Sequence, residues 1–175
     1  HACYIGVTVI FYNLFKPASR SVSLLALSFS LVGIATGAVN TLNAAAPWLV
    51  LGGADYLNAF TTAQLQGLAY VFLRLDSLGF SISGVFFGIY MIAIGGLIAG
   101  STLLPRILGV LLVIGGLCYL IDSFVRFLSP PLAAQLSAYY ITLPGLASEL
   151  VLALWLFLAG VNGAKWQAQA GAAEG

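Results

Sequence analysis

The chain has 175 residues, of which 61% are hydrophobic and 6% are charged, and its mean hydropathy is +1.06. A soluble domain carries about 25% charged residues, and a globule of this size has too little interior for so many apolar side chains. The formal net charge of +1 leaves no basic surface for nucleic acid, so we expect the lipid bilayer as a partner and no nucleic acid.

Apolar runs along the chain predict an all-α, multi-pass transmembrane helical bundle that forms a single domain over residues 1–166. An α-helix needs about 20 residues to cross about 30 Å of hydrocarbon. The first run, closed by Lys16 and Pro17, is too short to cross alone, so we expect it to be truncated and the full protein to have six spans. The five spans predicted in this chain lie at about residues 1–15, 21–46, 79–99, 107–128 and 143–161.

The connection between the second and third spans contains a helix start of its own. Thr61 and Gln64 have the spacing of a capping box, which predicts an interfacial helix over residues 61–78. A straight helix from Thr61 to Ala99 would be about 58 Å long, well beyond the bilayer. We therefore expect a bend near Gly79 or an interfacial first half.

Two later segments are predicted to lack regular structure. Pro130 and Pro131 end the fourth span, and the following residues 132–142 are predicted to form a short loop. The small residues at positions 167–175 predict a disordered tail.

Glycines recur at helical spacing in three places. The pairs Gly33/Gly37, Gly84/Gly88 and Gly96/Gly100 are small-xxx-small patterns, which allow two helices to approach closely. In a chain with 20 glycines, packing within the bundle is the expected meaning of these patterns.

The cations between the spans predict the orientation of the chain. Lys16, Arg20, Arg106 and Lys165 fall on one side if the spans alternate, and the opposite loops contain no Lys or Arg. Cytoplasmic loops are enriched in these residues. We therefore expect segments 16–20 and 100–106 and the C-terminus to be cytoplasmic.

The polar groups within the spans are predicted to lie in the outer half of the bilayer, from counting about 1.5 Å per residue along each helix. Because a charge that faces lipid is costly, we expect these side chains to face inward and pair. Asp122 and Arg126 can pair along one helix, whereas Glu149 needs Arg74 or a proton. The predicted cluster consists of Asn40, Asn43, Arg74, Asp76, Asp122, Arg126 and Glu149. It is either a satisfied polar plug that locks helix packing or a binding pocket open to the outside.

The sequence contains no motif of a catalytic or metal site. HExxH, GxSxG and HxxE spacings are absent, and Cys3 and Cys118 lie in apolar runs without CxxC spacing, as packed thiols do. The single histidine, His1, is a weak candidate for an axial haem ligand. We therefore expect no cofactor, and contact with a pigment or haem only through a protein partner.

Short motifs in a fixed order resemble a known family. They are YNLFKP at residues 12–17, SVSLL at 21–25, VNTLN at 39–43, FFGIY at 86–90, LPRILG at 104–109 and YLIDSF at 119–124. Over about residues 2–166 the sequence resembles the bacterial domain-of-unknown-function 4386 family of multi-pass inner-membrane proteins. The resemblance implies six helices, with one upstream of this chain, and a location in the bacterial inner membrane. It supplies no catalytic residues, and it implies that Asp76 and Asp122 stand where His or Asn also occurs.

Three classes of function are consistent with these features. The favoured interpretation is a non-enzymatic accessory or structural subunit of a larger membrane complex, because the loops are short and glycines and aromatic residues for helix contacts are abundant. Other membrane subunits are then expected partners. The alternative is a protein that binds or transports a small solute, an ion or a lipid headgroup in an outward-facing polar pocket. The third is an intramembrane enzyme.

Overall fold

The computed structural model describes residues 1–136 and 143–174, and this part of the chain is helical, as predicted. Three of its helices, α2, α3 and α4, are long and apolar enough to cross a membrane, and α1 and α6 are shorter apolar helices. In chain order the elements are α1 (Ala2–Phe15), α2 (Arg20–Val50), the 3-10 helix η1 (Asp55–Leu57), α3 (Thr62–Gly100), α4 (Arg106–Leu128), α5 (Pro130–Leu136), α6 (Leu143–Leu158) and α7 (Gly163–Glu174).

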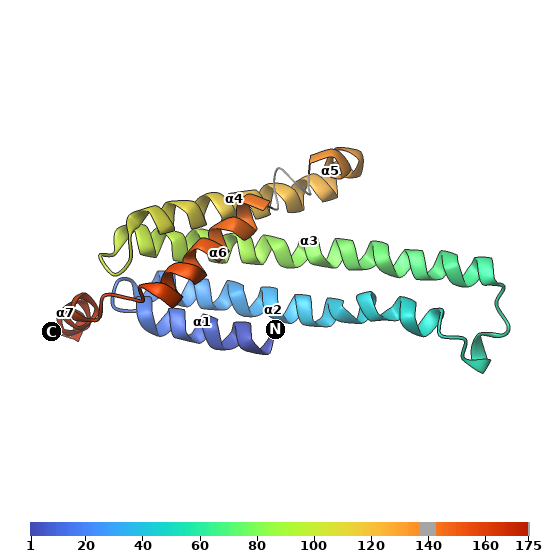
Figure 1. The fold of residues 1–175 in the computed structure, drawn as a ribbon, viewed down its shortest axis with the longest axis horizontal. Helices are drawn as coiled ribbons and strands as arrows, with labels where there is room; N and C mark the ends of the chain where they lie inside the picture. The colour runs from blue at the N-terminus through green and yellow to red at the C-terminus, as the bar shows by residue number, and fades with distance from the viewer. Residues whose placement is uncertain (137–142, 175) are drawn as a thin grey trace.

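Helix α3 is the centre of the bundle. It packs along α2 on one side and along α4 on the other, while α1 packs on α2 and α6 on α4 (Figure 1). Helices α2 and α3 run side by side as a long hairpin that extends beyond α1 and α6 (Figure 1). Helix α6 crosses the bundle obliquely (Figure 1), and residues of α1 and α6 form much of the lining of the larger of the two cavities described below.

Glycines set the close approach of α3 and α4. A Cβ at position 88 would lie 2.8 Å from the Gly116 carbonyl oxygen, and one at position 109 would lie 2.5 Å from the Gly95 carbonyl oxygen. Neither helix can carry a side chain there without moving away from the other. The Gly84/Gly88 pattern therefore marks a real helix contact. The Gly96/Gly100 pattern does not, because nothing lies within 4 Å of a Cβ at either position and the contacting residue is Gly95.

Helix α3 is continuous through Gly79 and shows no sharp bend there (Figure 1), so the first of the two predicted alternatives, a bend near this residue, is wrong. The other alternative, an interfacial first half of the helix, stays a prediction. The glycine instead makes room for the Asn40 side chain of α2, which occupies the space that a Cβ at position 79 would need. The capping box at the start of α3 is confirmed. The Thr61 N–H donates to Gln64 Oε1 at 2.8 Å, and the Gln64 N–H donates to Thr61 Oγ1 at 3.3 Å.

Three boundaries near the ends of helices differ from the prediction. Helix α2 continues through Pro47 to Val50 instead of ending at residue 46. Helix α5 starts at Pro130, in the segment predicted to end a span and begin a loop, because proline is well suited to the first helical turn. Helix α6 ends at Leu158 instead of residue 161, and Gly160 follows it with a φ of +67°.

The segment predicted as a disordered tail, residues 167–175, is helical through Glu174 as part of α7. Alanine and glutamine dominate this segment, and both favour the helix. The part of the predicted loop 132–142 that follows residue 136 lies outside the described residues.

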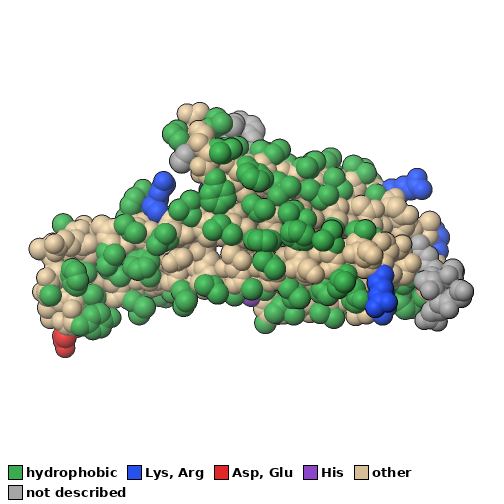
Figure 2. All heavy atoms as spheres, turned by 180° about the vertical axis from the view of Figure 1, so that it is seen from behind, with side chains coloured by type: hydrophobic (Ala, Val, Ile, Leu, Met, Phe, Trp, Pro, Cys, Tyr) green, Lys and Arg blue, Asp and Glu red, His purple; other side chains and the backbone are tan. Residues whose placement is uncertain are grey.

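The α1–α2 connection, the α3–α4 connection and α7 lie at one end of the molecule (Figure 1), and Lys and Arg side chains are seen there (Figure 2). These segments carry the four connecting cations Lys16, Arg20, Arg106 and Lys165, as their spacing predicted. Two hydrogen bonds hold the connections of this end together. The Trp166 indole N–H donates to the Leu14 carbonyl at 3.1 Å, and the Asn162 N–H donates to the Leu103 carbonyl at 3.3 Å. Exposed apolar side chains cover much of the body between the two ends (Figure 2).

Candidate functional site

The seven polar residues of the predicted cluster do not form one site. All lie in the halves of their helices away from the end that carries the four connecting cations. Within that half the structure divides them into an amide group on α2 and α3, an ion pair on α4 and a single carboxylate on α6. Arg74 belongs to none of these groups, because its side chain is exposed and forms no ion pair with Glu149.

The amide group joins α2 to α3. Asn40 is buried, and its side-chain N–H₂ donates to the Asp76 backbone carbonyl at 2.9 Å and to Asp76 Oδ1 at 2.8 Å. The Asn43 side chain donates to Asn40 Oδ1 at 3.0 Å. The bonds of Asn40 therefore fix the register of the hairpin, and Asn43 supports Asn40 from the same helix, as the polar-plug interpretation requires.

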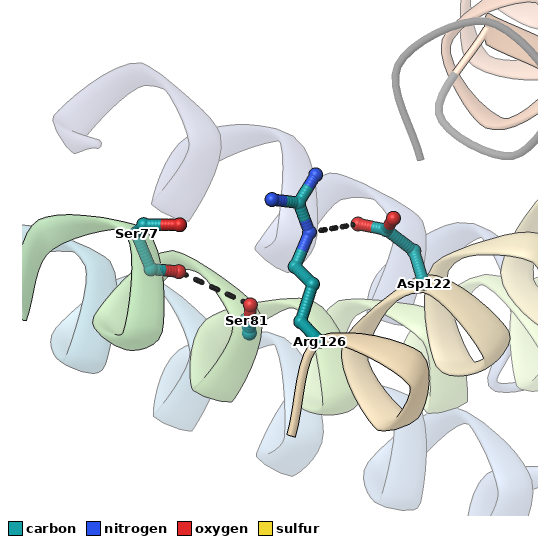
Figure 3. A network of polar contacts seen from close by, with 4 residues as sticks. All are labelled: Ser77, Ser81, Asp122 and Arg126. Carbon is teal, nitrogen blue, oxygen red and sulfur yellow. Dashed lines mark hydrogen bonds and ion pairs between the residues drawn. The ribbon is translucent and has the colours of Figure 1, made fainter. Parts of the chain in front are cut away.

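The ion pair lies along the last turns of α4. Arg126 Nε donates to Asp122 Oδ2 at 2.8 Å, and the two side chains point toward each other (Figure 3). Nearby on α3 the Ser81 hydroxyl donates to the Ser77 carbonyl at 3.1 Å (Figure 3). Asp122 is 4% exposed, and its second oxygen, Oδ1, has no hydrogen-bond partner in the described part of the chain. The predicted i,i+4 pair is thus present and partly buried.

The carboxylate of Glu149 is surrounded by tyrosines. Tyr4 of α1 and Tyr119 of α4 line a polar cavity together with Glu149, and Tyr4 and Tyr90 of α3 line an apolar cavity together with it. Among the described residues, no Lys or Arg forms an ion pair with Glu149. This is the one member of the predicted cluster that has an aromatic environment in place of a charged or amide partner.

Two cavities meet at Glu149. The first, of about 390 Å³, is the more polar and is lined by His1, Tyr4, Gly37, Asn40, Thr41, Ala44, Asp76, Phe80, Ser83, Gly84, Phe87, Tyr119 and Glu149. The second, of about 530 Å³, is lined almost entirely by apolar side chains: Tyr4, Val7, Ile10, Phe11, Tyr90, Met91, Leu112, Leu146, Glu149, Leu150, Leu152, Ala153 and Leu156. Tyr4 and Glu149 line both cavities, so the carboxylate stands at the boundary between a polar and an apolar space.

Comparison with known proteins places the chain in a family. A model described as a domain of unknown function, DUF4386, matches residues 1–160. The chain belongs to the DUF4386 family. An uncharacterized protein of Archaeoglobus fulgidus is similar to it, with 27% identity over 158 residues that cover 89% of this chain and 76% of the relative. No solved structure matches the chain.

Membership of the DUF4386 family confirms the resemblance seen in the sequence motifs and assigns no reaction. The described residues of this DUF4386 chain contain no group of three His, Cys, Asp or Glu side chains that could hold a metal ion. Cys3 is exposed on α1 and Cys118 is half-buried, so the prediction of a packed thiol is wrong for Cys3. His1 lines the polar cavity, where its ring lies close to Gly37.

The sequence-based cluster missed the tyrosines of this site. The available signal was their depth, because Tyr90 and Tyr119 lie in the middle of apolar runs, whereas tyrosines of membrane helices concentrate at the interfaces. Nothing in the linear sequence connects Tyr4, Tyr90 and Tyr119 to Glu149, since each residue comes from a different helix.

Proposed function

We propose that this DUF4386 protein is a helical membrane protein that binds an amphiphilic ligand of the bilayer in the two cavities that share Glu149. The observation that carries this proposal is the position of Glu149 and Tyr4 at the border of a polar cavity and a larger apolar one. A lipid or lipid-like molecule has the same division between a polar head and an apolar chain. Both volumes fall in the range of about 300–1,000 Å³ that is usual for small-molecule sites.

The apolar cavity is open at the surface of the bundle. Among its lining side chains, Ile10 of α1 is 64% exposed, and Leu146 and Leu150 of α6 are 55% and 57% exposed. In a membrane protein this surface faces hydrocarbon, so a ligand can enter sideways from the bilayer without crossing water. This favours an amphiphile over a polar solute as the ligand.

The other buried polar side chains differ from Glu149, and this difference supports a binding role for Glu149. Asn40 and Asp122 are engaged in hydrogen bonds or an ion pair that explain their burial as packing. Glu149 combines a carboxylate with adjoining open space, which a packing role alone does not require. The role of an accessory subunit in a larger complex remains a prediction, to be tested by gentle solubilisation and identification of any co-purifying subunits.

Filling the apolar cavity tests the binding proposal. Val7→Trp should reduce the amount of bound lipid or amphiphile at least about tenfold, because the indole occupies the space of the apolar chain. Val9→Trp is the matched control, since Val9 lies on the same helix, is also exposed and lines neither cavity. Native mass spectrometry of both variants in the same mild detergent measures the bound molecules.

Two outcomes would contradict the proposal. One is a wild-type protein that carries no amphiphile and takes up none when lipid extract is added. The other is equal occupancy in Val7→Trp and Val9→Trp, which would place the bound molecule elsewhere on the bundle.

We also propose that the end with the four connecting cations faces the cytoplasm of a plasma membrane, as the Lys and Arg bias supports. For labelling with a membrane-impermeant maleimide, Cys3 and Cys118 are first replaced by serine. Asp55→Cys should then react in intact cells, and Lys165→Cys only after the membrane is opened. The reverse pattern would invert the topology, and reaction of both positions in intact cells would contradict a spanning arrangement.

A further inference from the structure

The two cavities at Glu149 are lined by carboxyl groups, and no Lys or Arg stands among their described lining residues. The acidic side chains that line the polar cavity are those of Asp76 and Glu149, and its other titratable groups are those of His1, Tyr4 and Tyr119. The apolar cavity adds Tyr90.

Asp76 is already bonded to Asn40 of α2, so Glu149 is the carboxylate available to a ligand. A buried carboxyl group without a cationic partner holds a proton, and a bound cation can take the place of that proton. In a low-dielectric setting the resulting carboxylate attracts the cation much more strongly than it would in water. We infer that the ligand of this site is an amphiphile with an ammonium headgroup, whose charge lies beside Glu149 and whose alkyl chain fills the apolar cavity. This inference rests on the function proposed above.

The aromatic side chains around Glu149 suit an ammonium group. The rings of Tyr4 and Phe87 meet edge to face with centroids 5.1 Å apart, and Tyr4 and Tyr90 are similarly arranged at 6.3 Å. A cation gains about 0.5–2 kcal/mol over the face of such a ring when it lies within about 6 Å of the centroid. Aromatic cages with an acidic residue are suited to primary and quaternary ammonium groups, because both attractions act on the same charge.

The side chains of the site suit an alkylammonium better than an inorganic cation. A metal ion requires several oxygen or nitrogen ligands at short distance, and the described residues contain no group of three His, Cys, Asp or Glu that could supply them. An alkylammonium needs fewer close ligands and uses apolar contacts for the rest of its surface. The apolar lining next to Glu149 provides those contacts through Ile10, Phe11 and Leu150.

The test uses three probes on the full chain reconstituted in nanodiscs of a neutral lipid, with empty nanodiscs subtracted. Radiolabelled dodecyltrimethylammonium carries both the charge and the chain, dodecanol carries the chain alone, and tetramethylammonium carries the charge alone. We expect saturable binding of dodecyltrimethylammonium to the wild type, and at least about tenfold weaker binding of the other two probes.

Substitutions measure how much the Glu149 carboxylate and the Tyr4 ring each contribute to binding. Glu149→Gln should weaken dodecyltrimethylammonium binding at least about tenfold while dodecanol binding and thermal stability are retained, because the amide keeps the size of the side chain. Asp55→Asn is the control, since Asp55 lies on the η1 connection far from the cavities along the hairpin. Tyr4→Phe should bind the ammonium nearly as well as the wild type and Tyr4→Leu should bind it less tightly, because only the former keeps the aromatic face.

Different binding results would overturn the ammonium headgroup and the binding of an amphiphile. Saturable binding of dodecanol that equals that of dodecyltrimethylammonium, with no effect of Glu149→Gln, would overturn the ammonium headgroup and leave an amphiphile-binding protein. Binding of tetramethylammonium as tight as that of the long-chain probe would overturn the amphiphile in favour of a soluble cation. Absence of saturable binding for all three probes would overturn the proposed function itself.

Discussion

Replacing Gly109 with alanine is expected to lower the free energy of unfolding by about 1–3 kcal/mol, the usual cost of forcing extra atoms into a packed interface. A Cβ at this position would lie 2.5 Å from the Gly95 carbonyl oxygen and 2.6 Å from the Ala99 nitrogen. Both atoms belong to the backbone of α3 and cannot rotate away, so the helices must separate. The separation would also disturb the Gly88–Gly116 contact two turns along the interface. Unfolding of the purified protein in one mild detergent, followed by circular dichroism, measures the change.

The matched control is Gly96→Ala on the facing helix, one residue from Gly95. Nothing lies within 4 Å of a Cβ at position 96, and the residue is exposed. Alanine is a better helix former than glycine by up to about 1 kcal/mol, so this variant should be unchanged or slightly more stable. A Gly109→Ala protein as stable as Gly96→Ala would contradict the glycine-dependent packing of α3 on α4.

The second large effect is expected from Arg126→Gln. Asp122 is almost fully buried and its Oδ2 accepts from Arg126 Nε, so removal of the guanidinium leaves a buried carboxylate without its charged partner. Breaking a buried pair in this way costs about 3–5 kcal/mol of stability. The same unfolding measurement should show this loss.

A double variant distinguishes a lost ion pair from lost packing. Asp122→Asn together with Arg126→Gln removes both charges and should recover part of the stability that Arg126→Gln loses. Arg74→Gln is the control and should change stability by less than about 0.5 kcal/mol, because Arg74 is exposed and has no ion pair in the described structure. A double variant no more stable than Arg126→Gln would show that the charges are not the cause.

The presence of apolar helices was predictable because it depends on the local composition of the sequence. Long apolar runs, the Thr61–Gln64 capping box and the i,i+4 spacing of Asp122 and Arg126 are short-range patterns, and the structure contains each of them. Helix ends were less predictable. Pro130 starts a helix in place of a loop, and Gly79 accommodates a neighbouring side chain in place of a bend, because each residue has two uses that only its surroundings distinguish.

The sequence by itself determined that this chain is a bundle of apolar helices with its connecting cations on one end, because hydropathy and charge are sums over neighbouring residues. Only the tertiary structure decided which polar residues meet. It separated Arg74 from Glu149 and used Asn40 and Asp122 in packing. It also brought Tyr4, Tyr90 and Tyr119, from three different helices, to the cavities beside Glu149 on a fourth. The physical reason is that the rotation of each helix about its axis depends on glycine contacts and ring packing across helices, which leave no local pattern in the sequence.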